Sequence, residues 1–411
     1  MRLILSLFLL VILISCKDNT PVKPVSLEDD VALLASDSLM GRKTGTEGET
    51  KAAEYVVERF TQIGLMPKGS EGFYQKFSFK PNSNPHEETQ FVEAVTDSTH
   101  TGENVIGYID NKAAKTIVIG AHFDHLGMGG EGSLYRGEEP AIHNGADDNA
   151  SGVAVMLQLA DRLKKLENPQ SNFLFIGFSG EEMGLLGSNY FVKNPTIDLQ
   201  TVDLMINMDM VGRLNAENTL AVHGVGTSPI FKQLLFSNND QGFNIAEHES
   251  GIGPSDHTSF YLVDVPVLHF FSGQHEDYHK PSDDFEKLNY AGMEKIANYI
   301  FNIVKDLDDD PKLAFRKTKN ESEDVPAFKV ALGVVPDYLF TGEGMRIDGV
   351  SEDKPAQKAG LQKGDVVKKM GDSTVVDMMS YMRALSSFKE GQKTKVLVDR
   401  KGEKLEVEVE F

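Results

Sequence analysis

Residues 173–182 read FLFIGFSGEE, an apolar run of strand length followed by a Ser-Gly turn and two adjacent acids, Glu181 and Glu182. Similar apolar runs cover residues 116–120, 202–210 and 265–271. Strands that are apolar almost without interruption, and that are separated by helices, are typical of a sheet covered on both faces. The sequence therefore predicts an α/β fold in which helices sandwich a mixed central sheet.

The segments between these runs support that prediction. Residues 47–63, 152–166 and 293–307 carry apolar side chains at helical spacing, which predicts amphipathic helices. Residues 81–103 are polar and lack a period, which predicts a loop.

Length and composition define the domain organisation. With 411 residues the chain exceeds one ordinary core, so we expect two domains. A charged, apolar-poor stretch indicates a linker between them. The net charge of −21 argues against a nucleic-acid partner, because such binding depends on Lys and Arg. The expected divisions are residues 1–15, 16–25, 26–307, 308–326 and 327–411, as signal peptide, tether, large domain, linker and small domain.

The N-terminus predicts export from the cytoplasm. An apolar run of signal-peptide length follows Arg2 and ends at Cys16, the only cysteine in the chain. This ending resembles a bacterial lipobox, which implies lipidation of Cys16, attachment to a membrane and a location in the bacterial cell envelope. The alternative is an ordinary signal peptide in which the cysteine falls by chance. Without a second cysteine, no internal disulfide can form.

Short motifs that could carry chemistry follow the predicted strands. They contain His122 and Asp124, Glu181 and Glu182, Asp209, and the run from Tyr278 to Asp284; Asp148 lies in a turn before a helix. Ligands collect at the carboxyl ends of strands in such sheets. Together the motifs offer imidazole and carboxylate donors for two divalent cations. Taken singly, each has a simpler reading, such as a helix cap at Asp148 or a solvated acidic loop at Glu181.

The order of the motifs is more specific than any one of them. H-x-D, G-A-x-D-N-A-S-G, G-E-E-x-G-L-x-G-S, N-x-D-M-V-G and Y-H-x-P-x-D occur in that order between residues 122 and 283. The pattern resembles metallopeptidase family twenty-eight, the secreted bacterial leucyl aminopeptidases that are related to glutamate carboxypeptidase and glutaminyl cyclase. The resemblance spans residues 26–307 and includes the opening Gly41–Thr46 and Ser255–His257. It implies a zinc-exopeptidase-like fold and hydrolysis of N-terminal residues from peptides.

The resemblance also implies residue roles. One Zn²⁺ would be held by His122 and Asp209, and a second by Glu182 and His279. The ligand set is completed by Asp148, which would bridge the two ions and precede a cis peptide bond to Asn149. Catalytic roles would fall to Glu181 as general base, Asp124 as the partner of the His122 ring, and Tyr278 at the oxyanion. We expect Asp256, His257, His125 and His143 near the substrate, and the other histidines, His223 and His269 among them, in structural or surface positions.

Two other functions stay open. A glutaminyl-cyclase-like acyltransferase would use a single zinc, and the cyclases lack the first histidine of the pattern. A non-enzymatic envelope binding protein would hold no metal. Metal content per chain separates these readings from a two-zinc aminopeptidase.

The last 85 residues have a pattern of their own. Residues 355–365 read PAQKAGLQKGD, which resembles the circularly permuted PDZ domain of bacterial envelope proteases. The resemblance implies a small α+β domain in which Leu332, Gly333 and Val334 receive the C-terminus of a peptide ligand. The alternative is a packing module that binds nothing. We expect this domain to be dispensable for short substrates.

Overall fold

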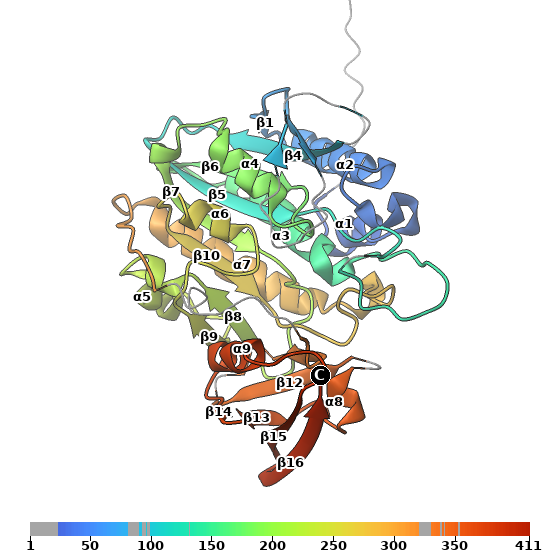
Figure 1. Cartoon of the computed structure of the whole chain (residues 1–411). Helices are drawn as coiled ribbons and strands as arrows, with labels where there is room; N and C mark the ends of the chain where they lie inside the picture. The colour runs from blue at the N-terminus through green and yellow to red at the C-terminus, as the bar shows by residue number, and fades with distance from the viewer. Residues whose placement is uncertain are drawn as a thin grey trace, which may run out of the picture.

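The protein is described by a computed structural model that covers residues 24–80, 90–92, 96, 99–130, 132–319, 330–337, 339–340, 342–351 and 354–411. Within them, a large α/β domain is followed by a smaller, mainly β domain (Figure 1). No helix in the described ranges has the length and apolar character needed to cross a membrane.

The large domain is built on one mixed sheet with the strand order β3-β2-β4-β6-β5-β7-β10-β8-β9, and β1 pairs with β4. At its centre β6, β5, β7 and β10 run parallel, whereas β4 and β8 join them antiparallel on either side. The strands are β1 (Met66–Pro67), β2 (Tyr74–Lys80), β3 (Gln90–Phe91), β4 (His100–Ile109), β5 (Lys115–His122), β6 (Ser171–Phe178), β7 (Val202–Met208), β8 (Thr219–His223), β9 (Asn244–His248) and β10 (Val267–Phe271).

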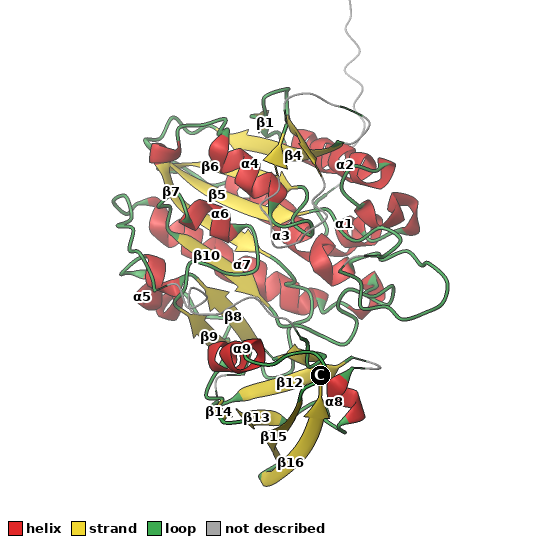
Figure 2. Ribbon diagram, viewed as in Figure 1, coloured by secondary structure: helices red, strands yellow, loops and turns green. Residues whose placement is uncertain are grey.

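Helices cover both faces of this sheet (Figure 2). Alternate residues of β5 show why: Ile117 and Ile119 pack in one apolar cluster with α1, α2, α3 and α7, whereas Val118 packs in another with α4 and α6. The predicted sandwich is therefore confirmed. The helices are α1 (Leu27–Leu34), α2 (Glu47–Ile63), α3 (Gly152–Lys164), α4 (Leu186–Lys193), α5 (Phe231–Ser237), α6 (His257–Tyr261) and α7 (Tyr290–Asp308).

One segment differs from the prediction. The loop expected over residues 81–103 contains β3 and the beginning of β4. Its polar sequence hid these strands because they extend the antiparallel side of the sheet, where one face can meet water.

The small domain has its own antiparallel sheet, in the order β11-β12-β13-β15-β16 with β14 on β13, and its own apolar cluster. Pro355 occupies the first turn of α8, where its missing N–H costs nothing, and Asp377 caps α9. The elements are β11 (Val334–Pro336), β12 (Met345–Val350), α8 (Pro355–Lys358), β13 (Val366–Met370), β14 (Ser373–Thr374), α9 (Met378–Ser386), β15 (Lys393–Arg400) and β16 (Glu403–Glu410).

The first part of the predicted linker packs against the large domain. The Leu313 side chain is buried, and its N–H donates to Asp203 Oδ1 at 2.6 Å. The Phe315 ring lies 5.6 Å from the Tyr261 ring. These two apolar residues attach a segment whose charged composition indicated a free linker. Residues 320–326 lie outside the described part of the chain.

Candidate active site

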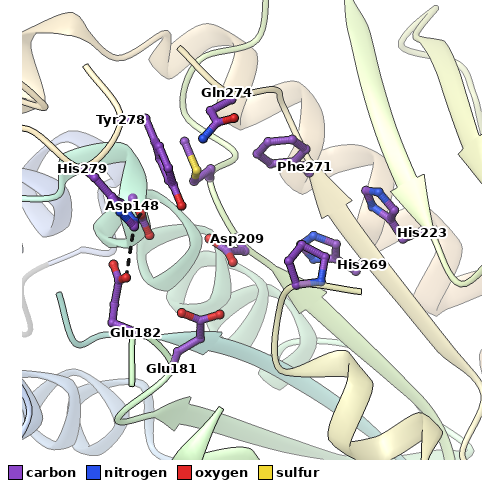
Figure 3. A pocket seen from close by; sticks show the side chains of 12 residues that line it. Asp148, Glu181, Glu182, Asp209, His223, His269, Phe271, Gln274, Tyr278 and His279 are labelled. Atoms are coloured by element: carbon purple, nitrogen blue, oxygen red, sulfur yellow. Dashed lines mark ion pairs between the residues drawn. The ribbon is translucent and has the colours of Figure 1, made fainter. Parts of the chain in front are cut away.

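Potential metal ligands gather where the parallel strands end (Figure 3). Because β6, β5 and β7 are neighbours and parallel, the residues that follow them meet at one edge of the sheet. Side chains from the turn before α3 and from the loop after β10 reach the same edge. The structure thus brings together His122, Asp148, Glu181, Glu182, Asp209 and His279.

The two oxygens of the Asp148 carboxylate face two different histidines. Oδ1 lies 3.3 Å from His122 Nε2, and Oδ2 lies 3.1 Å from His279 Nε2. His122 Nε2 is also 3.3 Å from Asp209 Oδ1, and His279 Nε2 is 3.3 Å from Glu182 Oε2. The donors therefore form two groups that share Asp148.

Each group fits a zinc ion by donor type and spacing. Histidine nitrogen and carboxylate oxygen bind zinc at about 2.0–2.2 Å, so neighbouring donors of a tetrahedral site lie roughly 3.3–3.6 Å apart. The observed separations of 3.1–3.3 Å are close to this. Among the described residues, no Lys or Arg forms an ion pair with these carboxylates. Since buried charges need a counter-charge, the site is suited to binding cations.

A third histidine, His125, lies on the inner side of Glu182. Its Nδ1 is 2.7 Å from Glu182 Oε1 and 4.0 Å from Asp148 Oδ2, so it is placed to position Glu182. His143 is 2.7 Å from Ser133 Oγ. Both rings are buried and neither lines the pocket, contrary to our expectation, because the chain after β5 turns into the interior of the domain.

Asp124 orients two parts of the site. His122 Nδ1 lies 3.2 Å from the Asp124 carbonyl oxygen and 3.6 Å from its carboxylate, which directs Nε2 toward the metal donors. The same carboxylate accepts hydrogen bonds from Thr44 Oγ1 at 3.0 Å and from the Glu181 backbone N–H at 3.1 Å. One buried acid therefore fixes both the His122 ring and the backbone that carries Glu181.

Glu181 faces a pocket of about 160 Å³ beside the two donor groups. Burial raises the pKa of Glu181 well above its ordinary value, and the carboxylates of Asp209 and Glu182 raise it further. Its neighbour Glu182 points instead to the histidines. The two adjacent acids thus face different partners, as predicted from their position after a strand.

The adjacent acids Asp147 and Asp148 also differ in direction. Asp147 Oδ1 accepts hydrogen bonds from Gly212 N–H at 2.6 Å and from Ser151 Oγ at 3.0 Å. Asp283 Oδ2 accepts the N–H groups of Asp147 and Asp148, at 2.9 and 3.1 Å. Asp147 therefore holds the turn, and only Asp148 faces the metal donors. The peptide bond from Asp148 to Asn149 is cis, as the resemblance implied.

Arg42 is completely buried and supports the turn that carries Asp148. It donates to four backbone carbonyls: Nε to Phe123 at 2.7 Å, Nη1 to Asn144 at 2.6 Å and also to Leu34, and Nη2 to Gly145 at 2.9 Å. Burial lowers the pKa of Arg42 to about 10. Because its donors are used by carbonyls, Arg42 positions the ends of β5 and the turn without neutralising a metal-facing acid through an ion pair.

Glu49, at the start of α2, holds the chain that precedes Glu181. It accepts hydrogen bonds from the backbone N–H groups of Gly45 at 2.5 Å and Glu103 at 3.2 Å, and from the Ser179 hydroxyl. Burial raises the pKa of Glu49 to about 7. Neither Glu49 nor Arg42 was predicted as a site residue; the Gly41–Thr46 string was the only signal near them.

Tyr278 lines the same pocket, and its hydroxyl points into it (Figure 3). Its ring stacks on that of His279, with centroids 3.8 Å apart. Burial, together with the carboxylates of Asp148 and Glu182, raises the pKa of Tyr278 well above its ordinary value. The hydroxyl therefore stays protonated and can donate a hydrogen bond.

The pocket wall opposite Glu182 contains two histidines that we had expected to be structural or at the surface. His223 on β8 and His269 on β10 line it together with Phe271 and Gln274 (Figure 3). Their rings stack at 5.1 Å. Burial lowers the pKa of both well below the ordinary value, so they are neutral. The apolar β strands that carry them gave no sign that their ends would open on the pocket.

Asp256 and His257 lie behind this wall. Both are fully buried and neither lines the pocket; His257 stacks on His269 at 4.5 Å. Burial raises the pKa of Asp256 to about 7 and lowers that of His257 to about 3. Both residues lie behind the lining side chains because α6 packs against β10 and β7 of the sheet, and their part in substrate binding stays a prediction.

The predicted peptide-binding loop of the small domain leads into its outermost strand, β11. Leu332 is buried in the domain core, and Gly333 has a left-handed φ of 79°, where a Cβ would meet Lys354. The carbonyls of both are used, by the N–H groups of Ala356 and Ser351. Val334 begins β11, and binding of a ligand by the three residues stays a prediction.

Cys16, the predicted lipidation site, lies outside the described residues.

The fold and the paired donor groups together define a zinc-exopeptidase-like α/β domain followed by a small β-rich domain. Residues 104–304 match peptidase family M28, and residues 313–411 match the PDZ domain. The chain therefore carries an M28 peptidase domain and a C-terminal PDZ domain, which confirms both resemblances.

Relatives with curated names share part of the sequence. Aminopeptidase YwaD of Bacillus subtilis (strain 168) is 26% identical over 255 residues, which are 58% of this chain and 52% of that protein. The alkaline phosphatase isozyme conversion protein of Escherichia coli (strain K12) is 31% identical over 172 residues, which are 41% and 46% of the two chains. The chain thus spans about half the length of these relatives.

Solved structures share the fold. An aminopeptidase from Aneurinibacillus sp. strain AM-1 has a TM-score of 0.54 at 18% identity, over 74% of this chain and 98% of that one. Glutaminyl cyclase from Porphyromonas gingivalis also has a TM-score of 0.54 at 18% identity, over 68% and 97%. Because a peptidase and a cyclase match equally well, the fold alone does not separate the two chemistries.

Proposed function

We propose that this protein is a two-zinc aminopeptidase that removes N-terminal residues from peptides. The observation that carries the proposal is the Asp148 carboxylate, whose two oxygens face two separate groups of donors. A single-metal site would need only one of these groups. The M28 match and the relatives named as aminopeptidases support the same activity.

The ligand roles follow from the two groups. His122 and Asp209 would hold one Zn²⁺, Glu182 and His279 the other, and Asp148 both. When bound, the ions would polarise the scissile carbonyl and lower the pKa of a water molecule. His125 would position Glu182 from within the protein.

Glu181 would act as general base in hydrolysis. Its carboxylate takes a proton from the attacking water as the oxygen adds to the carbonyl carbon, and it returns that proton to the leaving nitrogen when the C–N bond breaks. The products are a free amino acid and a peptide shortened by one residue. Tyr278, protonated and directed into the pocket, would donate a hydrogen bond to the developing oxyanion.

The charge of the pocket supports recognition of a free α-amine. Glu181, Glu182 and Asp209 line it, whereas Arg213, one candidate for binding a C-terminal carboxylate near the metals, is already paired with Asp277 at 2.9 Å. Carboxylates beside the reacting atoms favour a cationic terminus.

The proposal is tested with matched peptides that carry a free or an N-acetylated amino end, incubated with zinc-loaded protein. We expect stepwise release of N-terminal amino acids from the free peptides and none from the acetylated ones. Equal rates on both would refute aminopeptidase action but leave metal-dependent hydrolysis open. Release from the C-terminus would point to carboxypeptidase action.

A second candidate is a glutaminyl-cyclase-like acyltransferase, because a cyclase matches the fold as well as an aminopeptidase does. It would convert N-terminal glutamine to pyroglutamate with loss of ammonia. Peptides that begin with Gln separate the two reactions by mass. Cyclisation lowers the mass of the peptide by about 17 Da, the mass of one ammonia, whereas hydrolysis removes the whole glutamine residue. An inert protein without metal would instead support a non-enzymatic envelope binding protein.

We further propose that the protein is a lipoprotein of the bacterial envelope, anchored through Cys16. The apolar run that ends in the only cysteine supports this. Cys16→Ser removes the residue that would carry the acyl chains, so it should shift the protein from the membrane fraction to the soluble fraction or block its maturation. Stable anchoring needs more than one acyl chain. Unchanged fractionation would contradict the anchor.

A further inference from the structure

A second, larger cavity lies between the peptidase and PDZ domains. It has a volume of about 600 Å³, within the range of small-molecule and peptide sites. One wall comes from the peptidase segments 134–137 and 275–280, and the other from β11, β12 and Lys363 of the PDZ domain. We call this cavity the interdomain groove.

The groove begins where the active-site pocket ends. Tyr278 lines both cavities, so it separates the metal donors on one side from the groove on the other. A peptide whose amino end lies among the carboxylates would pass Tyr278 and continue into the groove. The geometry therefore places the PDZ domain beside the path of the substrate.

Packing holds the PDZ wall in place. Leu339 lies so close to Gly273, just after β10, that a Cβ at Gly273 would be 2.6 Å from Leu339 Cδ1. On the linker side, Thr318 Oγ1 accepts the Gly251 N–H at 3.0 Å, and its own N–H donates to Tyr261 Oη at 2.9 Å. The chain entering the PDZ domain is thus attached to the peptidase domain.

The groove differs in charge from the metal edge. Arg136 and Lys280 line it and donate hydrogen bonds to carbonyl oxygens: Arg136 to those of Ser133 and Tyr135, and Lys280 to that of Glu276. In the described part of the chain neither forms an ion pair. On the PDZ wall, Lys363 is paired with Asp348 at 3.0 Å. Glu276 also lines the groove, so Arg136 and Lys280 together exceed its charge by one positive charge that is left for an anionic ligand group.

We propose that the interdomain groove binds the downstream residues of a peptide substrate, with its C-terminal carboxylate near Arg136 and Lys280. Acids beside the metal donors would bind the α-amine of the peptide, and basic side chains in the groove would bind its C-terminal carboxylate. Short free peptides are the substrate class that fits both. This inference rests on the proposed function, and it replaces our expectation that the PDZ domain is dispensable for short substrates.

The test compares two substrates with the same N-terminal residue: an aminoacyl p-nitroanilide, which ends just beyond the scissile bond, and a tetrapeptide that extends into the groove. Ser351→Trp should fill the groove from the PDZ wall, since the Ser351 backbone N–H, which bonds to Gly333, is kept. The tetrapeptide-to-anilide ratio of kcat/KM should fall about tenfold or more, mainly through KM. Thr374→Trp, an exposed PDZ position outside the groove, is the matched control and should leave the ratio unchanged.

The carboxylate is tested with Arg136→Gln. Wild-type protein should prefer a tetrapeptide with a free C-terminus over its amide, and Arg136→Gln should lose most of that preference, about fivefold or more. A ratio that Ser351→Trp leaves at the wild-type value, or a preference for the free acid that Arg136→Gln keeps, would overturn the inference.

Binding of the tetrapeptide to the Glu181→Gln variant, measured by calorimetry, separates this inference from the proposed function. If wild-type protein hydrolyses neither substrate, the proposed function fails. The groove is then upheld if Ser351→Trp weakens this binding and overturned if it does not.

Discussion

Asp148 in the peptidase domain and Asp365 in the PDZ domain are about equally buried, but their partners differ. Asp365 accepts two hydrogen bonds from the Arg400 guanidinium, at 2.7 and 2.8 Å. Asp148 faces the nitrogens of His122 and His279, with His125 Nδ1 farther away at 4.0 Å. A buried acid that is paired with a cationic side chain is already neutralised. A buried acid that faces imidazoles and lies among other acids is placed to bind an added cation.

The same contrast holds within the peptidase domain. Asp30 on α1 and Arg59 on α2, both buried, pair at 2.9 Å. Structural ion pairs therefore occur in both domains, whereas the acids that face the metal donors, Asp148, Glu182 and Asp209, pair with no Lys or Arg among the described residues. The comparison separates acids that stabilise the fold from acids that serve the site, and each can be tested by removing it.

The largest effect is expected for Asp148→Ala. Because Asp148 is the donor that both groups share, its loss should release metal from both sites and reduce peptidase activity to background. Metal content after dialysis, measured by elemental analysis, checks this directly. One fully occupied site in the variant would show that Asp148 does not bridge.

Glu181→Gln should separate chemistry from metal binding. Glutamine keeps the size of the side chain but cannot accept the proton, so we expect unchanged metal content and a kcat lower by on the order of a thousandfold. Parallel measurement of metal content and kcat tests this. If the remaining activity per bound metal equals that of wild type, Glu181 is not the base.

A smaller effect is expected for Thr44→Val, which removes the hydrogen bond from Thr44 Oγ1 to Asp124 while keeping the shape of the side chain. Partners of this kind typically contribute about 10–100-fold in metal affinity or activity, and a single hydrogen bond to such a partner should lie at the lower end. Competition with a chelator measures the affinity. Thr50→Val, on an exposed turn of α2, is the control and should change nothing.

Residues within a local motif could be predicted from the sequence, whereas residues that act on distant parts of the chain could not. His122, Asp148 and Glu182 stand in strings whose spacing reflects the end of a strand or the start of a helix, so the sequence placed them correctly at one edge. Arg42 and Glu49 could not be identified, because each acts on backbone groups far away in sequence, and a buried arginine leaves no local pattern. The strands β2, β4, β8 and β9 were missed for a related reason, since strand pairing on the flanks of a sheet depends on neighbours distant in sequence.

The pocket walls were predictable only in part. His223 and His269 became lining residues because β8 and β10 are neighbours, which no spacing of motifs reveals. The interdomain groove is a still clearer case: its lining residues come from two domains, and only their packing brings Tyr278 near Val335 and Ser351.

The smallest effect is expected for Arg400→Met in the PDZ domain. The substitution keeps much of the apolar stem of Arg400 but leaves the buried Asp365 with the Gln362 N–H at 3.0 Å as a partner, so we expect the PDZ domain to lose about 1–3 kcal/mol of stability. Hydrogen exchange in β15 and β16 measures this loss within the full chain. Lys395→Met on the same strand is the control: its pair with Glu406 is exposed to solvent, so its loss should change the stability little. Because Asp365 is neutralised by the protein and lies outside the groove, Arg400→Met should keep the wild-type metal content and rate on the p-nitroanilide. Loss of metal in this variant would break the distinction between acids that stabilise the fold and acids that bind the cations.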